Sequence, residues 1–329
     1  MRPALISCAT IGALLLIAAV TTIDAQQPAN ARRVGVFPVG SASGSDQFQV
    51  LVKAFRDGLR DLGWIEGQNV VLEIRWGEGR ISDFPKIASE FVALSVDVIV
   101  TWGPQGTRAM QQATIPIVMA VVHEPVAFGF VKGFARPGGN ITGLAFQDSE
   151  LGTKRLELLK DVVPGMRRVA LLWDPTGGGE TGVRTVEASA RKLGLATQVL
   201  EVRRPEEFGP AFALARKGGA HAVIQIASPF LATHRRRIIE LAAAQRLPMT
   251  CETKLFVSEG CLMAYGPNFV EMSRRAALYV DRILKGVKPA DLPVEQPTNF
   301  ELALNTRTAK SLGLTIPRSL MMRADQVVE

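Results

Sequence analysis

The sequence predicts an α/β fold of two Rossmann-like lobes, each with a parallel sheet flanked by helices, facing each other across a cleft. Apolar runs alternate with amphipathic stretches from about residue 34 onward, which is the pattern of parallel strands covered by helices. Four short sequence features of the first half of the chain, called landmarks below, recur in the same order in the second half. A chain of 329 residues is long enough for one large or two medium domains.

In the first half, the apolar runs predict five strands separated by helices. The strands are expected at residues 34–39, 70–76, 96–102, 115–122 and 141–146. The first helix is expected over residues 46–62, where Phe48, Leu51, Phe55, Leu59 and Leu62 share one face. Ser43 or Ser45 is its expected N-cap, and Gly63 is expected to end it.

The second half repeats this order. Residues 167–175 (RRVALLWDP) resemble residues 32–39 (RRVGVFPV), and the helix after each ends in a Leu-Gly pair. Residues 223–229 (VIQIASP) resemble residues 98–104 (VIVTWGP), and residues 247–251 (LPMTC) resemble residues 115–119 (IPIVM). Because four landmarks recur in order, we interpret the chain as two βα lobes of similar topology in tandem.

The composition is that of an ordinary globular protein. With 47% hydrophobic and 21% charged residues, it excludes a disordered, collagen-like or coiled-coil chain. The net charge is +7, but the basic pairs are scattered and lack interleaved aromatic residues, so nucleic acid is not an expected partner. A basic surface would suit an anionic membrane or an acidic partner.

Residues 1–25 are predicted to be a cleavable signal peptide, with Arg2 before an apolar stretch and the small residue Ala25 at the cleavage site. The alternative is an uncleaved anchor, because residues 4–23 are just long enough to cross a bilayer. No other stretch of the sequence is long and apolar enough to cross a bilayer, so a protein with several membrane spans is excluded. In the exported chain, Cys251 and Cys261 either form a disulfide or stay as two buried thiols.

The expected ligand site lies where loops leave the carboxyl ends of the strands, because that edge of an open parallel sheet meets the helix N-termini. Two lobes that face each other share one cleft there. The loops of interest span residues 40–47, 102–107, 123–126, 174–181, 228–233, 252–254 and 265–268.

One loop fits a dinucleotide-binding pattern. Residues 177–182 (GGGETG) match G-x-G-x-x-G, follow an expected strand and precede an expected helix, and Glu201 lies near the end of the next strand. The motif begins the second lobe rather than the first, and an exported protein meets little nicotinamide cofactor. We therefore interpret it as a flexible loop before a helix and expect no cofactor.

Residues 102–107 (WGPQGT) join a strand to a helix whose free N–H groups can hold an anion, with Thr107 able to add a hydrogen bond. Trp102 either stacks on a ligand ring or packs at the edge of the core. His123 and Glu124 follow the fourth strand, but no second His or Cys lies nearby in sequence, so no metal site can be assembled. These two residues are expected to hydrogen-bond a ligand or the backbone.

Nucleophilic catalysis has little support in the sequence. Residues 40–44 (GSASG) carry Ala at the centre and so differ from the G-x-S-x-G elbow, and neither cysteine has a nearby activating His. We expect no enzymatic activity.

The chain resembles the substrate-binding proteins of ABC importers, in particular the tryptophan/tyrosine-type family, over essentially all of the mature chain. The stretches that carry the resemblance are residues 55–60 (FRDGLR), 63–70 (GWIEGQNV), 136–143 (RPGGNITG), 154–160 (KRLELLK), 265–267 (YGP), 283–294 (ILKGVKPADLPV) and 305–314 (NTRTAKSLGL).

This resemblance implies a type I periplasmic binding protein, with two lobes hinged around a cleft and joined by three crossings. The crossings would fall at residues 140–146, 265–268 and 297–304. The implied first lobe comprises residues 26–144 and 268–297, and the second comprises residues 145–267 and 298–329. The chain departs from the family's usual residues at 102–105 (WGPQ) and 174–175 (DP), both expected in the cleft, so the ligand is not determined.

The resulting hypothesis is a periplasmic, monomeric solute-binding protein that captures a small molecule, such as an amino acid or an aromatic compound, and delivers it to an ABC permease. The alternatives are a ligand-sensing module for a membrane receptor and an exported NAD(P)-dependent oxidoreductase. The ligand-binding residues expected from the first lobe are Ser41, Ser43, Trp102, Gly103, Thr107, His123 and Glu124. Those expected from the second lobe are Asp174, Ser228, Phe230 and Tyr265.

Overall fold

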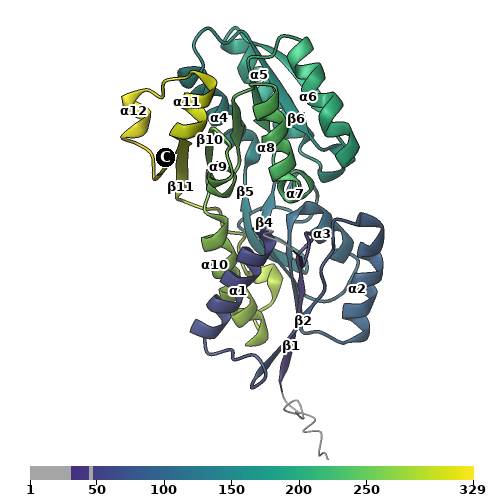
Figure 1. Ribbon diagram of the computed structural model, residues 1–329. Coiled ribbons are helices and arrows are strands. Elements are labelled where there is room, and N and C mark those ends of the chain that lie inside the picture. The colour runs from purple at the N-terminus through teal and green to yellow at the C-terminus, as the bar shows by residue number, and fades with distance from the viewer. Residues whose placement is uncertain (1–30, 44–46) are drawn as a thin grey trace, which may run out of the picture.

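The structure is a computed structural model that describes residues 31–43 and 47–329. It has two lobes, one above the other in Figure 1, and each is built on one sheet. The predicted signal peptide and the candidate N-cap Ser45 lie outside the described residues. Within the described part of the chain, no helix is both long and apolar enough to span a bilayer.

The first lobe contains a five-stranded parallel sheet in the order β2-β1-β3-β4-β5. Its strands are β1 (Arg32–Phe37), β2 (Val70–Ile74), β3 (Val98–Trp102), β4 (Ile117–His123) and β5 (Ile141–Phe146). The helices α1 (Gln47–Asp61), α2 (Phe84–Ala93), α3 (Gly103–Met110) and α10 (Phe269–Leu284) pack on it. As Figure 1 shows, α1 and α10 lie on one side of the sheet and α2 and α3 on the other.

The second lobe contains a seven-stranded sheet in the order β12-β11-β10-β9-β8-β6-β7. All neighbouring strands run parallel except β10 and β11, which are antiparallel. The strands are β6 (Arg168–Trp173), β7 (Ala196–Glu201), β8 (Ala222–Gln225), β9 (Met249–Cys251), β10 (Met263–Pro267), β11 (Phe300–Asn305) and β12 (Gln326–Val328). The helices are α4 (Asp148–Val162), α5 (Glu180–Lys192), α6 (Phe208–Lys217), α7 (Pro229–Thr233), α8 (Arg235–Ala244), α9 (Lys254–Ser258), α11 (Thr306–Leu312) and α12 (Arg318–Met321).

The two sheets share one topology. The order β2-β1-β3-β4-β5 corresponds strand for strand to β7-β6-β8-β9-β10. In each lobe, the strand that comes second in the sequence therefore lies at the edge of the sheet, beside the first. The predicted two-lobed α/β fold is confirmed, and the recurring landmarks in the sequence mark equivalent strands. The second sheet differs from the first by two further strands, β11 and β12, which extend it beyond β10.

The chain moves between the lobes more than once. After β10, in the second sheet, it enters α10, which packs on α1 and on strands β3, β4 and β5 of the first lobe. The short helix at Pro289–Asp291 also lies against β5, and β11 then returns to the second sheet. The residue boundaries of the two lobes stay a prediction.

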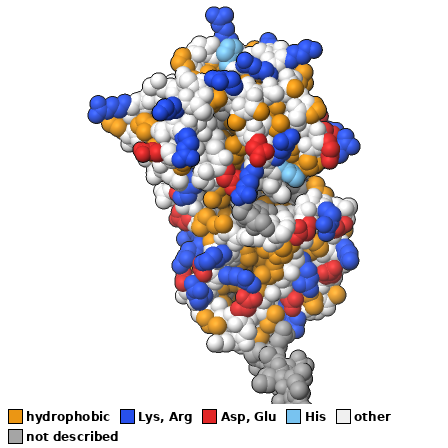
Figure 2. Space-filling model, viewed as in Figure 1, with side chains coloured by type: hydrophobic (Ala, Val, Ile, Leu, Met, Phe, Trp, Pro, Cys, Tyr) orange, Lys and Arg blue, Asp and Glu red, His pale blue; other side chains and the backbone are white. Residues whose placement is uncertain are grey.

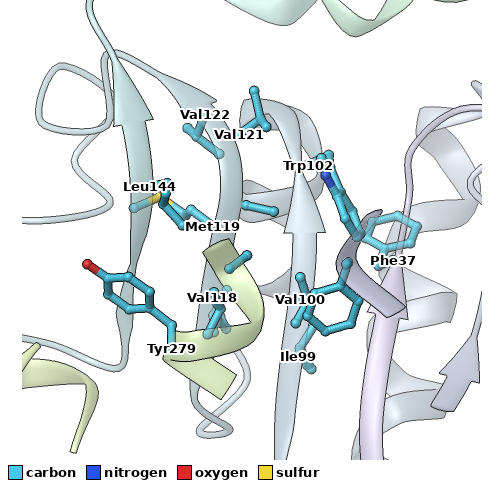
Figure 3. Packing of buried hydrophobic residues seen from close by; sticks show 14 of the residues in the cluster. Phe37, Ile99, Val100, Trp102, Val118, Met119, Val121, Val122, Leu144 and Tyr279 are labelled. Carbon is cyan, nitrogen blue, oxygen red and sulfur yellow. The ribbon is translucent and has the colours of Figure 1, made fainter. Parts of the chain in front are cut away.

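The core of the first lobe is one continuous apolar cluster between the sheet and its helices. Figure 3 shows Ile99 and Val100 on β3 beside Val118 and Met119 on β4, with Tyr279 of α10 nearby. The second lobe has one apolar cluster on each face of its sheet. These rigid sheets hold the loops at their carboxyl ends in fixed positions.

The bounds of most helices and strands differ by a few residues from the sequence prediction, and two of these differences concern residues named above. Leu62 was expected on the buried face of the first helix, but α1 ends at Asp61 and Leu62 is 38% exposed. His123, expected in a loop, is the last residue of β4. The face of the molecule in Figure 2 carries Lys and Arg interspersed with Asp and Glu, without one large basic patch.

Candidate ligand-binding site

A cavity of about 30 Å³ lies between the lobes, at the carboxyl ends of both sheets. The first lobe contributes most of its lining, and the second contributes four residues from two loops. The lining residues are Gln47, Phe48, Leu51, Trp102, Gly103, Pro104, Val121, His123, Phe146 and Phe269 from the first lobe and Ala227, Ser228, Pro229 and Glu252 from the second. In this closed arrangement the cavity has room for about one or two water molecules.

Most of the cavity wall is apolar. Phe48, Leu51, Phe146 and Phe269 are all buried and line it together with Trp102. The Trp102 indole donates from Nε1 to Ser273 Oγ at 3.0 Å and meets the Phe55 ring edge-to-face at 6.1 Å. Trp102 therefore belongs to the core of the first lobe and is also one of the residues that line the cavity.

His123 is the most unusual polar residue of the wall. Its ring lies 5.3 Å from that of Phe128 and 6.0 Å from that of Phe146, and the residue is only 3% exposed. Neither ring nitrogen has a hydrogen-bond partner among the described residues. Burial lowers the pKa of His123, with Asp148 and Glu124 acting in the opposite direction, so the imidazole is neutral at pH 7.

Glu252, directly after β9, is the acidic residue of the cavity wall and is 3% exposed. Burial raises the pKa of Glu252 to about 8; Asp148 acts in the same direction and Arg155 opposes both. Its carboxyl group therefore carries a proton at neutral pH. The preceding residue, Cys251, forms a disulfide with Cys261, which resolves the alternatives that the sequence left open.

A buried ion pair supports the wall from behind. Arg155 Nη1 donates to Asp148 Oδ1 at 2.8 Å, and Arg155 Nε donates to the Tyr265 carbonyl oxygen at 2.7 Å. The second oxygen of Asp148 accepts from the Ala227 backbone N–H at 3.0 Å. Through these bonds α4 is tied both to β10 and to the loop that carries Ala227 and Ser228.

Asp174 and Ser228 lie together, but only Ser228 lines the cavity. Asp174 is fully buried, and one carboxylate oxygen accepts from Ser228 Oγ at 2.7 Å. The other accepts from the backbone N–H and the hydroxyl of Thr176, at 2.8 and 2.5 Å. The second lobe's own donors therefore occupy this carboxylate, while Ser228 also caps the start of α7.

Seven of the eleven predicted site residues do not line the cavity, and besides Asp174, Ser41 and Ser43 these are Thr107, Glu124, Phe230 and Tyr265. Thr107 donates to the Gly103 carbonyl oxygen within α3 at 3.0 Å, and Glu124 accepts from the hydroxyl of Ser149 at 2.7 Å. Phe230 stacks on Phe208 and Tyr265 on Phe300, with ring separations of 5.3 and 6.1 Å. The contacts of these side chains thus point to roles in holding the loops.

Ser41 and Ser43 lie at a separate pocket of about 280 Å³. Its other lining residues belong to the second lobe and are Thr233, His234, Arg235, Arg236 and Arg237. Ser41 Oγ donates to Glu78 Oε2 at 2.5 Å. The structure therefore separates these two serines from Trp102, Gly103, His123 and Ser228, which it brings together.

The glycine-rich loop that resembles a dinucleotide motif contacts the opposite lobe. Gly178 has φ of 79°, and the Phe128 ring lies where a side chain at this position would project. Its carbonyl oxygen accepts from Trp173 Nε1 at 2.5 Å. Gly103 is in a similar position: with φ of 77°, a Cβ there would lie 2.6 Å from Pro229 Cγ in the second lobe. Both glycines allow the lobes to meet closely.

Two polar lining residues, Gln47 and Glu252, are not among the residues predicted from the sequence. The loop at residues 252–254 was expected at the cleft, but its acidic residue was not selected. The sequence signal that could have identified Glu252 is a carboxylate directly after an expected strand and next to a cysteine. Gln47 is the first residue of α1, and its Oε1 is buried without a hydrogen-bond partner among the described residues.

A family model described as ABC transporter substrate binding protein matches residues 42–328. A curated relative, a tyrosine-binding protein from Clostridioides difficile (strain R20291), is 25% identical over 266 residues, which cover 80% of this chain and 76% of the relative.

Solved structures show the same fold. An ABC domain from Streptococcus pneumonia in complex with L-Trp has a TM-score of 0.84 and 23% identity, covering 91% of this chain and all of the other. A ligand-free, open substrate-binding protein with adhesive properties from Clostridium difficile has a TM-score of 0.65 and 20% identity, covering 91% of this chain and 99% of the other.

Proposed function

The chain belongs to the ABC transporter substrate-binding protein family and has the type I periplasmic binding protein fold, and on this premise we propose that it captures a small molecule between its lobes for delivery to a membrane permease. The observation that carries the proposal is the cavity at the carboxyl ends of both sheets, with lining residues from both lobes. A ligand held there contacts the two lobes at once.

Capture by this mechanism needs lobe movement but no chemical step. The cavity of about 30 Å³ is too small for an amino acid, so the lobes separate to admit a ligand and close around it. A ligand that bridges the lobes favours the closed state by its higher affinity for that state. The family is one of substrate-binding proteins, which are not enzymes.

The proposed ligand is an amino acid or an aromatic compound. Phe48, Trp102, Phe146 and Phe269 provide an apolar wall suited to a ring, and His123 and Glu252 provide polar groups. The tyrosine-binding relative and the L-Trp complex support this class. Gly103 and Ser228 complete the proposed contacts. The other predicted site residues are proposed to act indirectly, by holding the segments around the cavity in place; they are Ser41, Ser43, Thr107, Glu124, Asp174, Phe230 and Tyr265.

The cellular location, the oligomeric state and the lobe boundaries are part of the same proposal. We propose export through cleavage after residue 25, a periplasmic location and a monomeric state, with lobes at residues 26–144 plus 268–297 and 145–267 plus 298–329. The predicted signal peptide and the family's role in import support export.

The experiment is a thermal-shift screen of the mature protein against L-tyrosine, L-tryptophan and benzoate, followed by small-angle scattering with the best compound. Binding raises the melting temperature, with roughly 2.7 kcal/mol of stabilisation at a hundredfold excess over Kd. The scattering profile is expected to become more compact. A ligand recovered chemically altered, or a profile unchanged by saturating ligand, contradicts the proposal.

A further inference from the structure

One aromatic side chain, Phe128, connects the cavity wall with the opposite lobe. Its ring meets the His123 ring edge-to-face, with centres 5.3 Å apart, and stacks on the Phe130 ring at 5.4 Å. His123 lines the interlobe cavity, whereas Phe128 is not among the lining residues. The Phe128 ring also lies where a side chain at Gly178 of the second lobe would project. It is therefore placed between a residue of the cavity wall and a loop of the other lobe.

The loop that carries Phe128 is fixed to the first lobe. Arg108 of α3 donates from Nη2 to the Phe128 carbonyl oxygen at 2.8 Å, and its guanidinium lies 4.8 Å from the centre of the Phe130 ring. Gln111 Nε2 donates to the Gly129 carbonyl oxygen at 3.3 Å. Phe130 itself is buried in the core of the first lobe. These contacts make the Phe128 ring move together with this lobe.

The loop that receives the ring is a run of three glycines in the second lobe, residues 177–179. Gly178 has φ of 79°, and its carbonyl oxygen accepts from Trp173 Nε1 at 2.5 Å. A Cβ at Gly178 would occupy the place of the Phe128 ring, so a larger residue there would exclude the ring. The glycine-rich motif of the sequence thus provides room for a ring of the opposite lobe.

This contact lies away from the places where the chain passes between the lobes. Those crossings come after β5, after β10 and before β11. Gly178 follows β6, which β8 and β9 separate from β10 in the second sheet. The short helix Pro175–Gly177 contacts α3, and in Figure 1 α3 lies on the opposite side of the first sheet from α10. A hinge motion about the crossings therefore separates Phe128 from Gly178 when the lobes open.

We infer that Phe128 is a positioning residue for ligand capture: its ring packs against Gly178 when the lobes close, and this contact slows release of the ligand. The inference rests on the proposed function and assigns a role to a residue outside the cavity wall. Because the contact forms on closure, after the ligand has entered the open cleft, it opposes reopening more than entry. The same ring supports His123, so the closed contact also fixes one residue of the wall.

The experiment is a double-variant cycle on the mature protein. The probe is L-tyrosine, L-tryptophan or benzoate, whichever binds most tightly in the thermal-shift screen, and surface plasmon resonance gives the rates of association and release. Phe128→Ala is expected to raise the release rate about tenfold and to change the association rate by less than about twofold. Gly178→Ala, whose Cβ displaces the ring, is expected to raise the release rate by a similar factor.

The double variant tests whether these two changes act on one contact. If they do, Phe128→Ala combined with Gly178→Ala should also release the probe about tenfold faster, because the contact can be lost only once. Two independent effects would multiply to about a hundredfold.

Two further variants separate this role from a merely structural one. Ile87→Ala shortens a buried side chain of the first-lobe core that does not line the cavity, so it should lower the melting temperature and leave both rates unchanged. Phe128→Tyr keeps the stacking on Phe130, but its hydroxyl is attached to Cζ, the ring atom nearest to the position of a Gly178 Cβ. Phe128→Tyr should therefore raise the release rate too, and it decides the matter if Phe128→Ala fails to fold.

The outcomes distinguish the inference from the proposed function. A hundredfold faster release from the double variant, or unchanged release from Phe128→Ala and Phe128→Tyr, overturns the inference while the proposed function stands. A slower association with unchanged release does the same, since the ring would then act before closure. Failure of the natural protein to bind all three compounds contradicts the proposed ligand class, and the inference falls with it.

Discussion

Arg155 Nη1 lies 2.8 Å from Asp148 Oδ1, and this ion pair is enclosed behind the interlobe cavity. Both residues belong to α4, two turns apart, yet their other bonds reach the Ala227 N–H and the Tyr265 carbonyl oxygen. The pair therefore joins a helix to two other segments of the second lobe. A buried pair of this kind is sensitive to loss of one partner, because the other is left as an uncompensated charge.

We expect Asp148→Asn to destabilise the protein by about 3 to 5 kcal/mol, because Arg155 would remain charged and buried. Urea denaturation of the natural and variant proteins measures the change. Glu157→Gln, an exposed position on the same helix, is the control and should change stability by less than about 0.5 kcal/mol. A loss below about 1 kcal/mol in Asp148→Asn would show that the pair is less buried than described.

Glu252→Gln is expected to raise the free energy of unfolding of the closed arrangement, in which Glu252 is buried. The pKa of Glu252 is raised from 4.5 to about 8, so between these values the folded state binds more protons than the unfolded state. The free energy of unfolding therefore falls as pH rises through this window, and above it the full cost is present. Glutamine does not ionise and avoids this cost.

The measurement is the melting temperature of both proteins at pH 5, 6, 7 and 8. The advantage of the variant should grow with pH by up to about 1.4 kcal/mol per unit. His123, whose pKa burial lowers, costs stability below about pH 6.5 in both proteins and cancels in the difference. A variant less stable than the natural protein at pH 8 would refute this account.

Replacing both Cys251 and Cys261 by Ser is expected to cost about 2 to 3 kcal/mol, since the disulfide closes a loop with a sequence separation of 10. Because Glu252 follows Cys251, the affinity for L-tryptophan should fall as well. Thermal denaturation with and without a reductant tests the first effect, and calorimetry the second. Insensitivity of the natural protein to reductant after full unfolding and refolding would mean that the bond does not contribute.

Gly178→Ala is expected to hold the lobes apart, because its Cβ would meet the Phe128 ring of the opposite lobe. Gly194→Ala is the matched control: its φ of 72° is close to the 79° of Gly178, but nothing lies within 4 Å of its Cβ. Both variants should lose about 1 to 2 kcal/mol of stability through backbone strain. A wider scattering profile and about tenfold weaker ligand binding should appear in Gly178→Ala alone.

The division into two similar α/β lobes could be predicted from the sequence, because apolar runs recur in the same order in both halves of the chain. Trp102, Gly103, His123 and Ser228 follow or end such strands, and all four line the cavity. The direction of the remaining side chains depends on local hydrogen bonds that the sequence does not reveal. Thr107 bonds back into α3 and Asp174 bonds to Thr176, so neither reaches the cavity.

Glu252 escaped selection for a different physical reason. The loop after β9 was expected at the cleft, but the local sequence does not reveal that the side chain of Glu252 is buried there. Its raised pKa comes from burial and from Asp148, which is distant in sequence. Tertiary packing, rather than any local pattern, creates the acidic part of this cavity.

The position of α10 limits how the molecule can be divided. This helix of 16 residues covers the first sheet but is encoded after β10 of the second. Shortening the gene from either end therefore cannot release an intact half: a product that stops before α10 exposes one flank of the first sheet, and a product that starts at α4 carries α10 without its support. An independently folding half would have to be spliced from separate pieces of the chain.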